Sequence, residues 1–154
     1  MEINILIDKE FKLKVKSAWL RKIVRPILNA ENIGVKSEVG LVITGDEKIQ
    51  ELNKKYLDED RPTDVMAFQT DEDKQIGFVN APDDKSHLGE VIISYPQAVR
   101  QAEEHNHPVE REMVILMIHG ILHLLGYDHD IPERTQKMRN RESDVLKMIE
   151  EQGL

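Results

Sequence analysis

The spacing of apolar residues along the chain divides it into short strands and longer helices. Alternating or short continuous apolar runs predict four strands, over residues 2–8, 39–44, 64–68 and 88–94. Apolar residues three and four apart predict five helices, over residues 14–29, 46–57, 96–104, 108–125 and 132–150. Strands and helices do not alternate strictly, so the expected fold is α+β, a small mixed four-stranded sheet packed against about five helices.

The region between the third and fourth predicted strands is polar. Residues 70–87 are expected to form a mobile loop, with a short hairpin around residues 76–79. The helix over residues 108–125 is different, because its centre from Val114 to Ile118 is apolar around much of the circumference. A helix of that kind is surrounded by protein. Gly126 is the expected left-handed cap that ends it.

Length and composition narrow the class of protein. The chain has 154 residues and no evident linker or repeat, so we expect one domain over residues 1–154. It has no cysteine, which excludes disulfides, thiolate nucleophiles and cysteine-type zinc sites. A metal ion would therefore be bound by His, Asp or Glu. The apolar runs are short and the first residues lack a secretion signal, so the expected localisation is cytoplasmic, without a membrane partner.

The charge of the chain is unevenly distributed. A formal net charge of −8 argues against a nucleic-acid-binding protein, since attraction to phosphates usually needs a basic face. Residues 9–25, however, contain seven Lys or Arg residues and a single acidic residue, Glu10. This segment is either a local basic face that contacts phosphates or an ordinary solvated helix face.

Three histidines lie close together in the sequence, at His119, His123 and His129. The first two are four residues apart on the predicted helix, so their side chains share one face and can reach one metal ion. A glycine with positive φ at Gly126 would turn the chain back and bring His129 to the pair. Three imidazole ligands leave a fourth tetrahedral position for water, which is typical of catalytic zinc. We therefore expect one Zn²⁺ per chain at the C-terminal end of this buried helix.

The histidine spacing also matches the metzincin peptidases, with one difference. Their general base is a glutamate directly after the first histidine, where this chain has Gly120. A metal site without that carboxylate can still polarise water. Asp128 and Glu112 are carboxylates that could act as a base. Asp128 could instead cap the turn or orient a histidine ligand through a hydrogen bond.

Three sequence blocks occur in an order and at a spacing that resemble a known family. The most specific block reads His119-Gly-Ile-Leu-His123-Leu-Leu-Gly-Tyr-Asp128-His129. Another reads Leu52-Asn53-Lys-Lys-Tyr56, followed by Asp60-Arg61-Pro-Thr-Asp64-Val-Met-Ala-Phe68. The remaining block reads Leu88-Gly-Glu-Val-Ile-Ile-Ser94. Together they resemble the YbeY family of bacterial rRNA maturation endoribonucleases over nearly the whole chain.

The resemblance implies a fold and an activity. The implied fold is a small mixed sheet with surrounding helices, and the implied metal is a zinc ion on His119, His123 and His129. The implied activity is hydrolysis of phosphodiesters in single-stranded RNA, with a water molecule that the metal activates. The implied role is in 16S rRNA 3′-end maturation and ribosome quality control. The expected partners are ribosomal RNA and the small ribosomal subunit, with ribosome-assembly factors as further candidates.

The chain departs from the family at one position. The family usually has an arginine directly after the aromatic residue of the second block, and this arginine is thought to serve catalysis. Here that position is Leu57, and Arg61 follows in the same turn as the candidate catalytic cation. The alternative is that Arg61 is an ordinary solvent-facing turn residue.

An RNA substrate also changes the interpretation of the basic segment. Its candidate RNA contacts are Lys14, Lys22 and Arg25. Two other functions remain open at this point. One is a metallohydrolase of another substrate class, and the other is a non-catalytic ribosome-associated factor with a structural metal.

Overall fold

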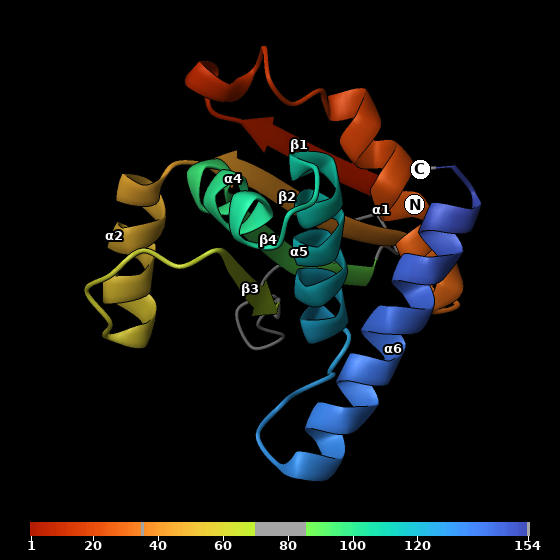
Figure 1. The fold of residues 1–154 in the computed structure, drawn as a ribbon. Helices are drawn as coiled ribbons and strands as arrows, with labels where there is room; N and C mark the ends of the chain where they lie inside the picture. The colour runs from red at the N-terminus through yellow and green to blue at the C-terminus, as the bar shows by residue number, and fades with distance from the viewer. Residues whose placement is uncertain (35, 70–85, 154) are drawn as a thin grey trace, which may run out of the picture.

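The computed structural model describes residues 1–34, 36–69 and 86–153, in which four strands form one mixed sheet (Figure 1). The strands are β1 (Glu2–Ile7), β2 (Ser37–Thr44), β3 (Val65–Gln69) and β4 (Ser86–Ser94). Their order in the sheet is β1-β2-β4-β3. β1, β2 and β4 run parallel, and β3 pairs with β4 in the antiparallel direction. The predicted mixed four-stranded sheet is confirmed.

Five α-helices and one short 3-10 helix surround the sheet in the described part of the chain. They are η1 (Lys9–Phe11), α1 (Ser17–Ala30), α2 (Asp46–Leu57), α4 (Tyr95–Glu104), α5 (Val109–Leu124) and α6 (Pro132–Glu151). The predicted α+β class with about five helices is therefore also confirmed. No described helix combines the length and the hydropathy that a membrane span requires.

The element boundaries differ from the predicted ones at a few ends. α1 begins at Ser17 rather than near Lys14, because η1 and a following turn occupy residues 9–15. Val15 is nevertheless buried, so its apolar character reflects packing of the turn and not an extra helical turn. β2 and β4 each begin two residues earlier than predicted. The predicted hairpin around residues 76–79 lies outside the described residues.

The two faces of the sheet pack against different helices. Val91 and Ile93 of β4 belong to the main core, which also contains the buried residues of α1, α5 and α6. Ile92, between them, belongs to a smaller cluster with Met66 and with Ile49 of α2. Successive strand residues point to opposite faces, so α2 covers the face that the other helices leave open. Figure 1 shows α5 in front of the sheet, between α4 and α6.

Helix α5 is the buried centre of the main core. Ten of its sixteen residues are buried, as the all-round apolar sequence predicts. Its contact with the sheet is very close at Gly120, where a Cβ atom would lie 2.5 Å from Cγ1 of Val91 and 3.3 Å from Cγ2 of Val65. Only a residue without a side chain fits at this distance. The close approach holds this part of α5 against β3 and β4.

Gly120→Ala should lower the thermal stability of the protein. Alanine has a higher helix propensity than glycine by about 1 kcal/mol. Overpacking against a β-branched side chain costs typically about 1–3 kcal/mol. The expected net loss of unfolding free energy is up to about 2 kcal/mol, or a melting temperature lower by up to about 8 °C in a domain of this size.

The matched control is Gly34→Ala, because a Cβ atom at Gly34 meets no atom within 4 Å. Calorimetry on the three proteins measures the difference. A melting temperature of Gly120→Ala above that of the wild type would show that the helix can move away from the sheet without cost.

Candidate metal centre

Three imidazole rings gather at the C-terminal end of α5. The ring centroids of His119 and His123, one turn apart on the helix, are 4.8 Å apart. The ring of His129, from the loop after α5, lies 5.1 Å from His123 and 6.2 Å from His119. All three residues line one cleft of about 800 Å³. The structure thus brings together the three histidines that the sequence singles out as metal ligands.

Gly126 turns the chain so that His129 can return to the helix. Its φ of 99° lies in the left-handed region. Its N–H donates to the carbonyl of His123 at 3.1 Å, and the N–H of Tyr127 donates to the carbonyl of Leu122 at 3.0 Å. These two hydrogen bonds form a Schellman motif, the expected left-handed helix end. No atom lies within 4 Å of a Cβ built at Gly126, so backbone conformation rather than space favours glycine here.

Glu142 on α6 orients the ring of His119. Its carboxylate oxygen Oε1 lies 3.0 Å from Nδ1 of His119. A carboxylate on Nδ1 favours the tautomer in which Nδ1 carries the proton, and this leaves the lone pair of Nε2 available. A carboxylate partner of this kind is usual for histidines that bind metal ions. Sequence reasoning missed Glu142, since it is 23 residues from His119 and no local spacing marks it.

The loop that carries His129 is anchored to α1 and α6. The Tyr127 hydroxyl donates to Glu31 at 3.0 Å. Arg141 donates from Nε to the same carboxylate and from Nη2 to the carbonyl of Ala30 at 2.8 Å. Burial, followed by the hydrogen bond to Glu31, raises the pKa of Tyr127, so the phenol keeps the proton that it donates. Arg141 and Glu142 are neighbours on α6, so this helix supports both parts of the histidine cluster.

The surroundings of His123 favour its neutral form. Burial lowers the pKa of this imidazole, and the neighbouring His119 and His129 lower it further. Histidine binds metal ions in its neutral form, so a lowered pKa extends metal binding toward acidic pH. Below that pKa, protonation of the ring competes with the metal. Three imidazoles, one with a carboxylate on Nδ1 and one with a lowered pKa, fit a divalent metal ion.

Asp128 supports the turn between His123 and His129. Its Oδ1 accepts a hydrogen bond from the backbone N–H of His129 at 2.7 Å, and lies 3.9 Å from Nδ1 of the same ring. The carboxylate therefore caps the loop, as one of the sequence interpretations holds. Its ligand atoms also lie within 4.8 Å of those of His123 and His129, so it is close enough to the site to contribute negative charge.

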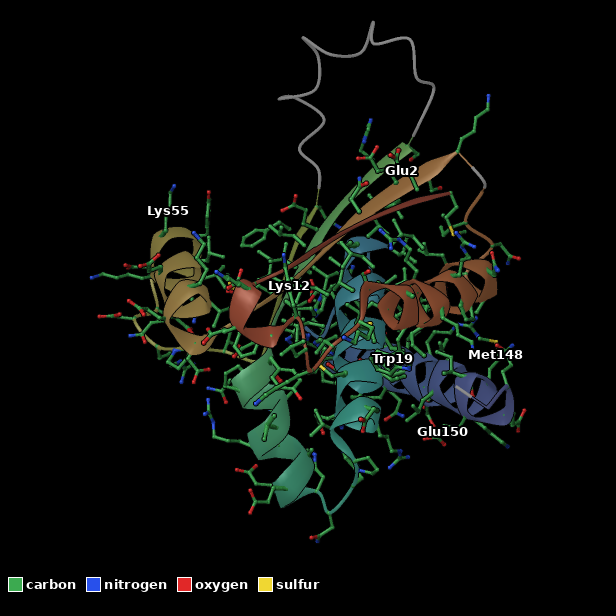
Figure 2. The ribbon with its side chains drawn as sticks, turned by 90° about the horizontal axis from the view of Figure 1, so that it is seen from above. Glu2, Lys12, Trp19, Lys55, Met148 and Glu150 are labelled. Atoms are coloured by element: carbon green, nitrogen blue, oxygen red, sulfur yellow. The ribbon has the colours of Figure 1, made fainter. Side chains whose placement is uncertain are left out.

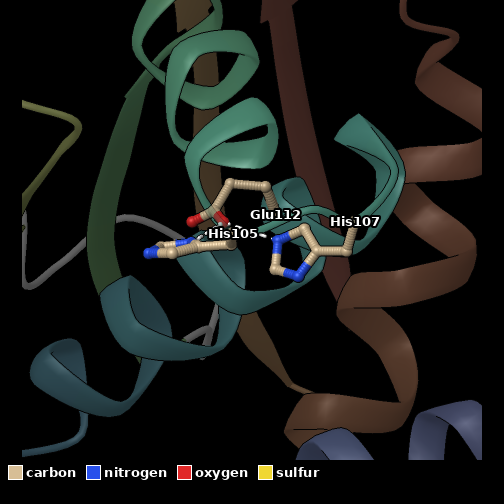
Figure 3. Close-up of side chains that lie close together, drawn as sticks. All are labelled: His105, His107 and Glu112. Atoms are coloured by element: carbon tan, nitrogen blue, oxygen red, sulfur yellow. Dashed lines mark hydrogen bonds and ion pairs between the residues drawn. The ribbon is translucent and has the colours of Figure 1, made fainter.

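A second group that could hold a metal ion lies at the other end of α5 (Figure 3). Glu112 is buried, and its Oε1 is 2.9 Å from Nδ1 of His105 and 2.7 Å from Nε2 of His107. Arg111, which can only donate, lies 3.4 Å from Nδ1 of His107. That contact favours a proton on Nε2 of His107, the atom that would have to bind the metal.

The hydrogen bonds thus favour the histidine cluster over the Glu112 group as the metal centre. They also bear on the proposal that Glu112 acts as a base. Its carboxylate is occupied by two imidazoles, and it precedes His119 by seven residues, about 10 Å along a helix. Glu112 is better described as the acceptor that joins the turn before α5 to the helix.

Arg61 lines the same cleft as the three histidines. Its backbone carbonyl accepts a hydrogen bond of 2.9 Å from the buried side chain of Asn53, which fixes the turn after α2. Its guanidinium lies 3.1 Å from Glu59, and the Arg61 side chain is 74% exposed. Leu57, at the position where the sequence resemblance implies an arginine, is exposed and lines the cleft as well.

The basic segment lies away from the histidine cluster. Lys14, Lys22 and Arg25 are exposed, in the turn before α1 and on α1 itself, and none of them lines the cleft. α1 follows β1, which is the edge strand opposite β3. Figure 2 shows α2 with Lys55 at one end of the molecule and α1 toward the other. Any phosphate contacts of this segment would therefore be separate from the cleft.

Known proteins resemble this chain over nearly its whole length. The family model described as "Endoribonuclease YbeY" matches residues 3–150. Endoribonuclease YbeY of Dehalococcoides mccartyi (strain CBDB1) is 45% identical over 98% of this chain and 95% of its own. Endoribonuclease YbeY of Roseiflexus sp. (strain RS-1) is 38% identical over 96% of this chain and 92% of its own. A solution structure of a Thermotoga maritima protein aligns with a TM-score of 0.56 at 27% identity, over 97% of this chain and 93% of that one.

His123→Ala should abolish stoichiometric metal binding, because two imidazoles hold a divalent ion far more weakly than three. We expect one equivalent of metal in the wild type and much less than one in the variant, measured by elemental analysis after dialysis. His105→Ala is the matched control and should keep its full equivalent. The reverse result, with metal lost from His105→Ala and kept by His123→Ala, would place the ion at the Glu112 group instead.

Glu142→Ala should weaken metal binding without removing a ligand. Loss of a carboxylate that orients a metal-bound histidine typically reduces affinity about 10–100-fold. Glu142→Gln, whose amide oxygen can still accept from Nδ1 of His119, should retain part of the affinity. Competition with a chromophoric chelator measures the dissociation constants, and Glu151→Gln on the same helix serves as a charge control. Wild-type affinity in Glu142→Ala would rule out an orienting role.

Proposed function

The chain belongs to the YbeY endoribonuclease family, and we propose that it is a zinc-dependent endoribonuclease that hydrolyses phosphodiesters in single-stranded RNA. The observation that carries this proposal is the convergence of His119, His123 and His129 on one cleft, with Glu142 behind His119. Three neutral imidazoles suit zinc, and with three protein ligands a fourth position stays open. When bound, the metal supplies a Lewis acid that activates water and offsets the negative charge of the phosphate.

The residues around the cleft have separate roles in this proposal. His119, His123 and His129 hold the metal, while Glu142 orients the first of these rings. Arg61 binds a non-bridging phosphate oxygen, for which the planar guanidinium fork is well suited. Its present partner is Glu59, in an exposed pair. Exposed pairs of this kind are worth about 0–1 kcal/mol, so a phosphate can replace the carboxylate at little cost.

Gly120 argues against the alternative of a metzincin-like peptidase. Gly120 lines the cleft beside His119 and carries no side chain, and a Cβ atom there would lie 2.5 Å from Cγ1 of Val91. The carboxylate that serves those enzymes as a base therefore has no equivalent at this place. RNA remains the substrate class that the family favours.

We further propose a role in 16S rRNA 3′-end maturation and ribosome quality control in the cytoplasm. The resemblance of the sequence blocks to the YbeY family supports this role, with ribosomal RNA and the small ribosomal subunit as partners. Lys14, Lys22 and Arg25 would contact RNA phosphates outside the cleft, which suits a substrate larger than the cleft itself. A protein that binds ribosomal particles but does not cleave RNA when loaded with zinc would support the non-catalytic alternative.

The activity can be tested with matched single-stranded and double-stranded oligoribonucleotides. The zinc-loaded protein should cleave the single strand internally, lose this activity on chelation and regain it when zinc is restored. Absence of cleavage by a preparation with one zinc per chain would contradict the proposed function.

Arg61→Ala should keep the fold and the zinc but cleave RNA more slowly. Loss of one charge-assisted contact to a transition state costs about 2–4 kcal/mol, or roughly thirty- to a thousandfold in rate. Arg61→Lys should recover only part of the rate, because an ammonium is a point charge. Arg139→Ala, which removes an exposed arginine of α6, is the charge control. Wild-type turnover in zinc-loaded Arg61→Ala would show that this arginine is a bystander.

A further inference from the structure

A pair of aromatic residues, one exposed and one partly buried, forms part of the cleft wall next to the candidate metal centre. Tyr56 is in the last turn of α2 and Phe68 is on β3. Their ring centroids are 5.1 Å apart with an interplanar angle of 62°, an edge-to-face arrangement. Both residues line the same cleft as His119, His123 and His129. Two chain segments therefore place aromatic rings beside the histidine cluster.

Tyr56 is unusually exposed for an aromatic residue with a fixed neighbour. Its exposed fraction is 55%, and that of the adjacent Leu57 is 60%. Single exposed apolar residues are ordinary on protein surfaces. Two neighbours that line a cleft together with convergent polar groups are instead typical of a ligand site. The cleft wall therefore has apolar surface available for a ligand.

The local structure holds Tyr56 in place and leaves 55% of it exposed, and a base that stacks on the face under Lys55 would displace that flexible side chain. α2 ends at Leu57 and is followed by Asp58, whose φ of 56° is left-handed, and the N–H of Glu59 donates to the carbonyl of Asn53 at 3.3 Å. Phe68 supports one side of the Tyr56 ring, and Nζ of Lys55 lies 5.2 Å from its centroid. An aromatic side chain has few rotatable bonds, so a supported ring loses little conformational entropy when a ligand binds.

We propose that Tyr56, supported by Phe68, stacks on an unpaired nucleobase of the RNA that occupies the cleft. The inference rests on the proposed function, because the ligand is the RNA substrate itself. Phosphate-binding groups and an aromatic platform together are the features by which proteins bind single-stranded nucleic acid. Arg61 contributes the cation, and Tyr56 contributes the platform on the same cleft wall.

The platform also accounts for selectivity toward single strands. In a duplex, neighbouring base pairs cover both faces of each base, so a side chain can stack only after the base has been unstacked. A base in a single strand is accessible without that cost. Stacking is tolerant of sequence because every base has a π face. Tyr56 therefore selects for an accessible base and not for a particular sequence.

The first experiment compares Tyr56→Ala, Tyr56→Phe and wild type as zinc-loaded proteins. The probe is a single-stranded oligoribonucleotide with one cleavage site and 2-aminopurine placed in turn at each neighbouring position. Wild type and Tyr56→Phe should quench the fluorescence at one position within the mixing time, before cleavage. Tyr56→Ala should lose this quenching and raise KM about five- to hundredfold, as expected for one base–aromatic stack. Leu6→Ala, an exposed apolar residue on β1, is the surface control and should behave as wild type.

The second experiment uses an oligoribonucleotide with an abasic nucleotide at the quenched position. On this substrate, the KM of wild type should rise to the KM that Tyr56→Ala has on the intact RNA. The KM of Tyr56→Ala should be the same on both substrates. If wild type cleaves the RNA and Tyr56→Ala shows the same KM and the same quenching as wild type, the stacking proposal alone is overturned. Failure of zinc-loaded wild type to bind or cleave any single-stranded RNA would overturn the proposed function and the stacking proposal with it.

Discussion

The close contact between α5 and the sheet is the constraint on which the candidate site depends. Gly120 brings the helix to within van der Waals contact of Val91 and Val65, so β3, β4 and this turn of α5 behave as one packed unit. His119 precedes this contact and His123 follows it by three residues. Because α5 is buried on most sides, its position is set by the core and not by the metal. The two helical histidines are therefore preorganised by packing before any ion binds.

The two groups of histidines at the ends of α5 differ in their hydrogen-bond partners, which are two carboxylates and one guanidinium. His119 faces Glu142 through Nδ1, which leaves Nε2 as the atom that can bind a metal. His107 faces Arg111 through Nδ1 and Glu112 through Nε2, so its hydrogen bonds specify the opposite tautomer. Distances alone do not separate these two groups. The chemistry of the partner on the far ring nitrogen does, and it connects α6 to the function of α5.

The sequence predicts those features that depend on neighbours in the chain. Strand alternation, the all-round apolar α5, the Gly126 turn and the three histidines all have short-range patterns, and the structure contains each of them. The predicted start of α1 at Lys14 is wrong because Val15 is buried in a turn, which helical spacing alone cannot distinguish from a helix. Glu142 and the pairing of Tyr56 with Phe68 depend on contacts between distant segments. No local pattern records such contacts.

Anomalous diffraction at the zinc absorption edge, from crystals of the purified protein, tests the central claim most directly. The account predicts one anomalous peak, between the Nε2 atom of His119 and the rings of His123 and His129, with Nδ1 of His119 on Glu142. It predicts no peak between His105, His107 and Glu112. A peak at that second group, or crystals of zinc-loaded protein without a peak at the three histidines, would contradict the assignment of the metal centre.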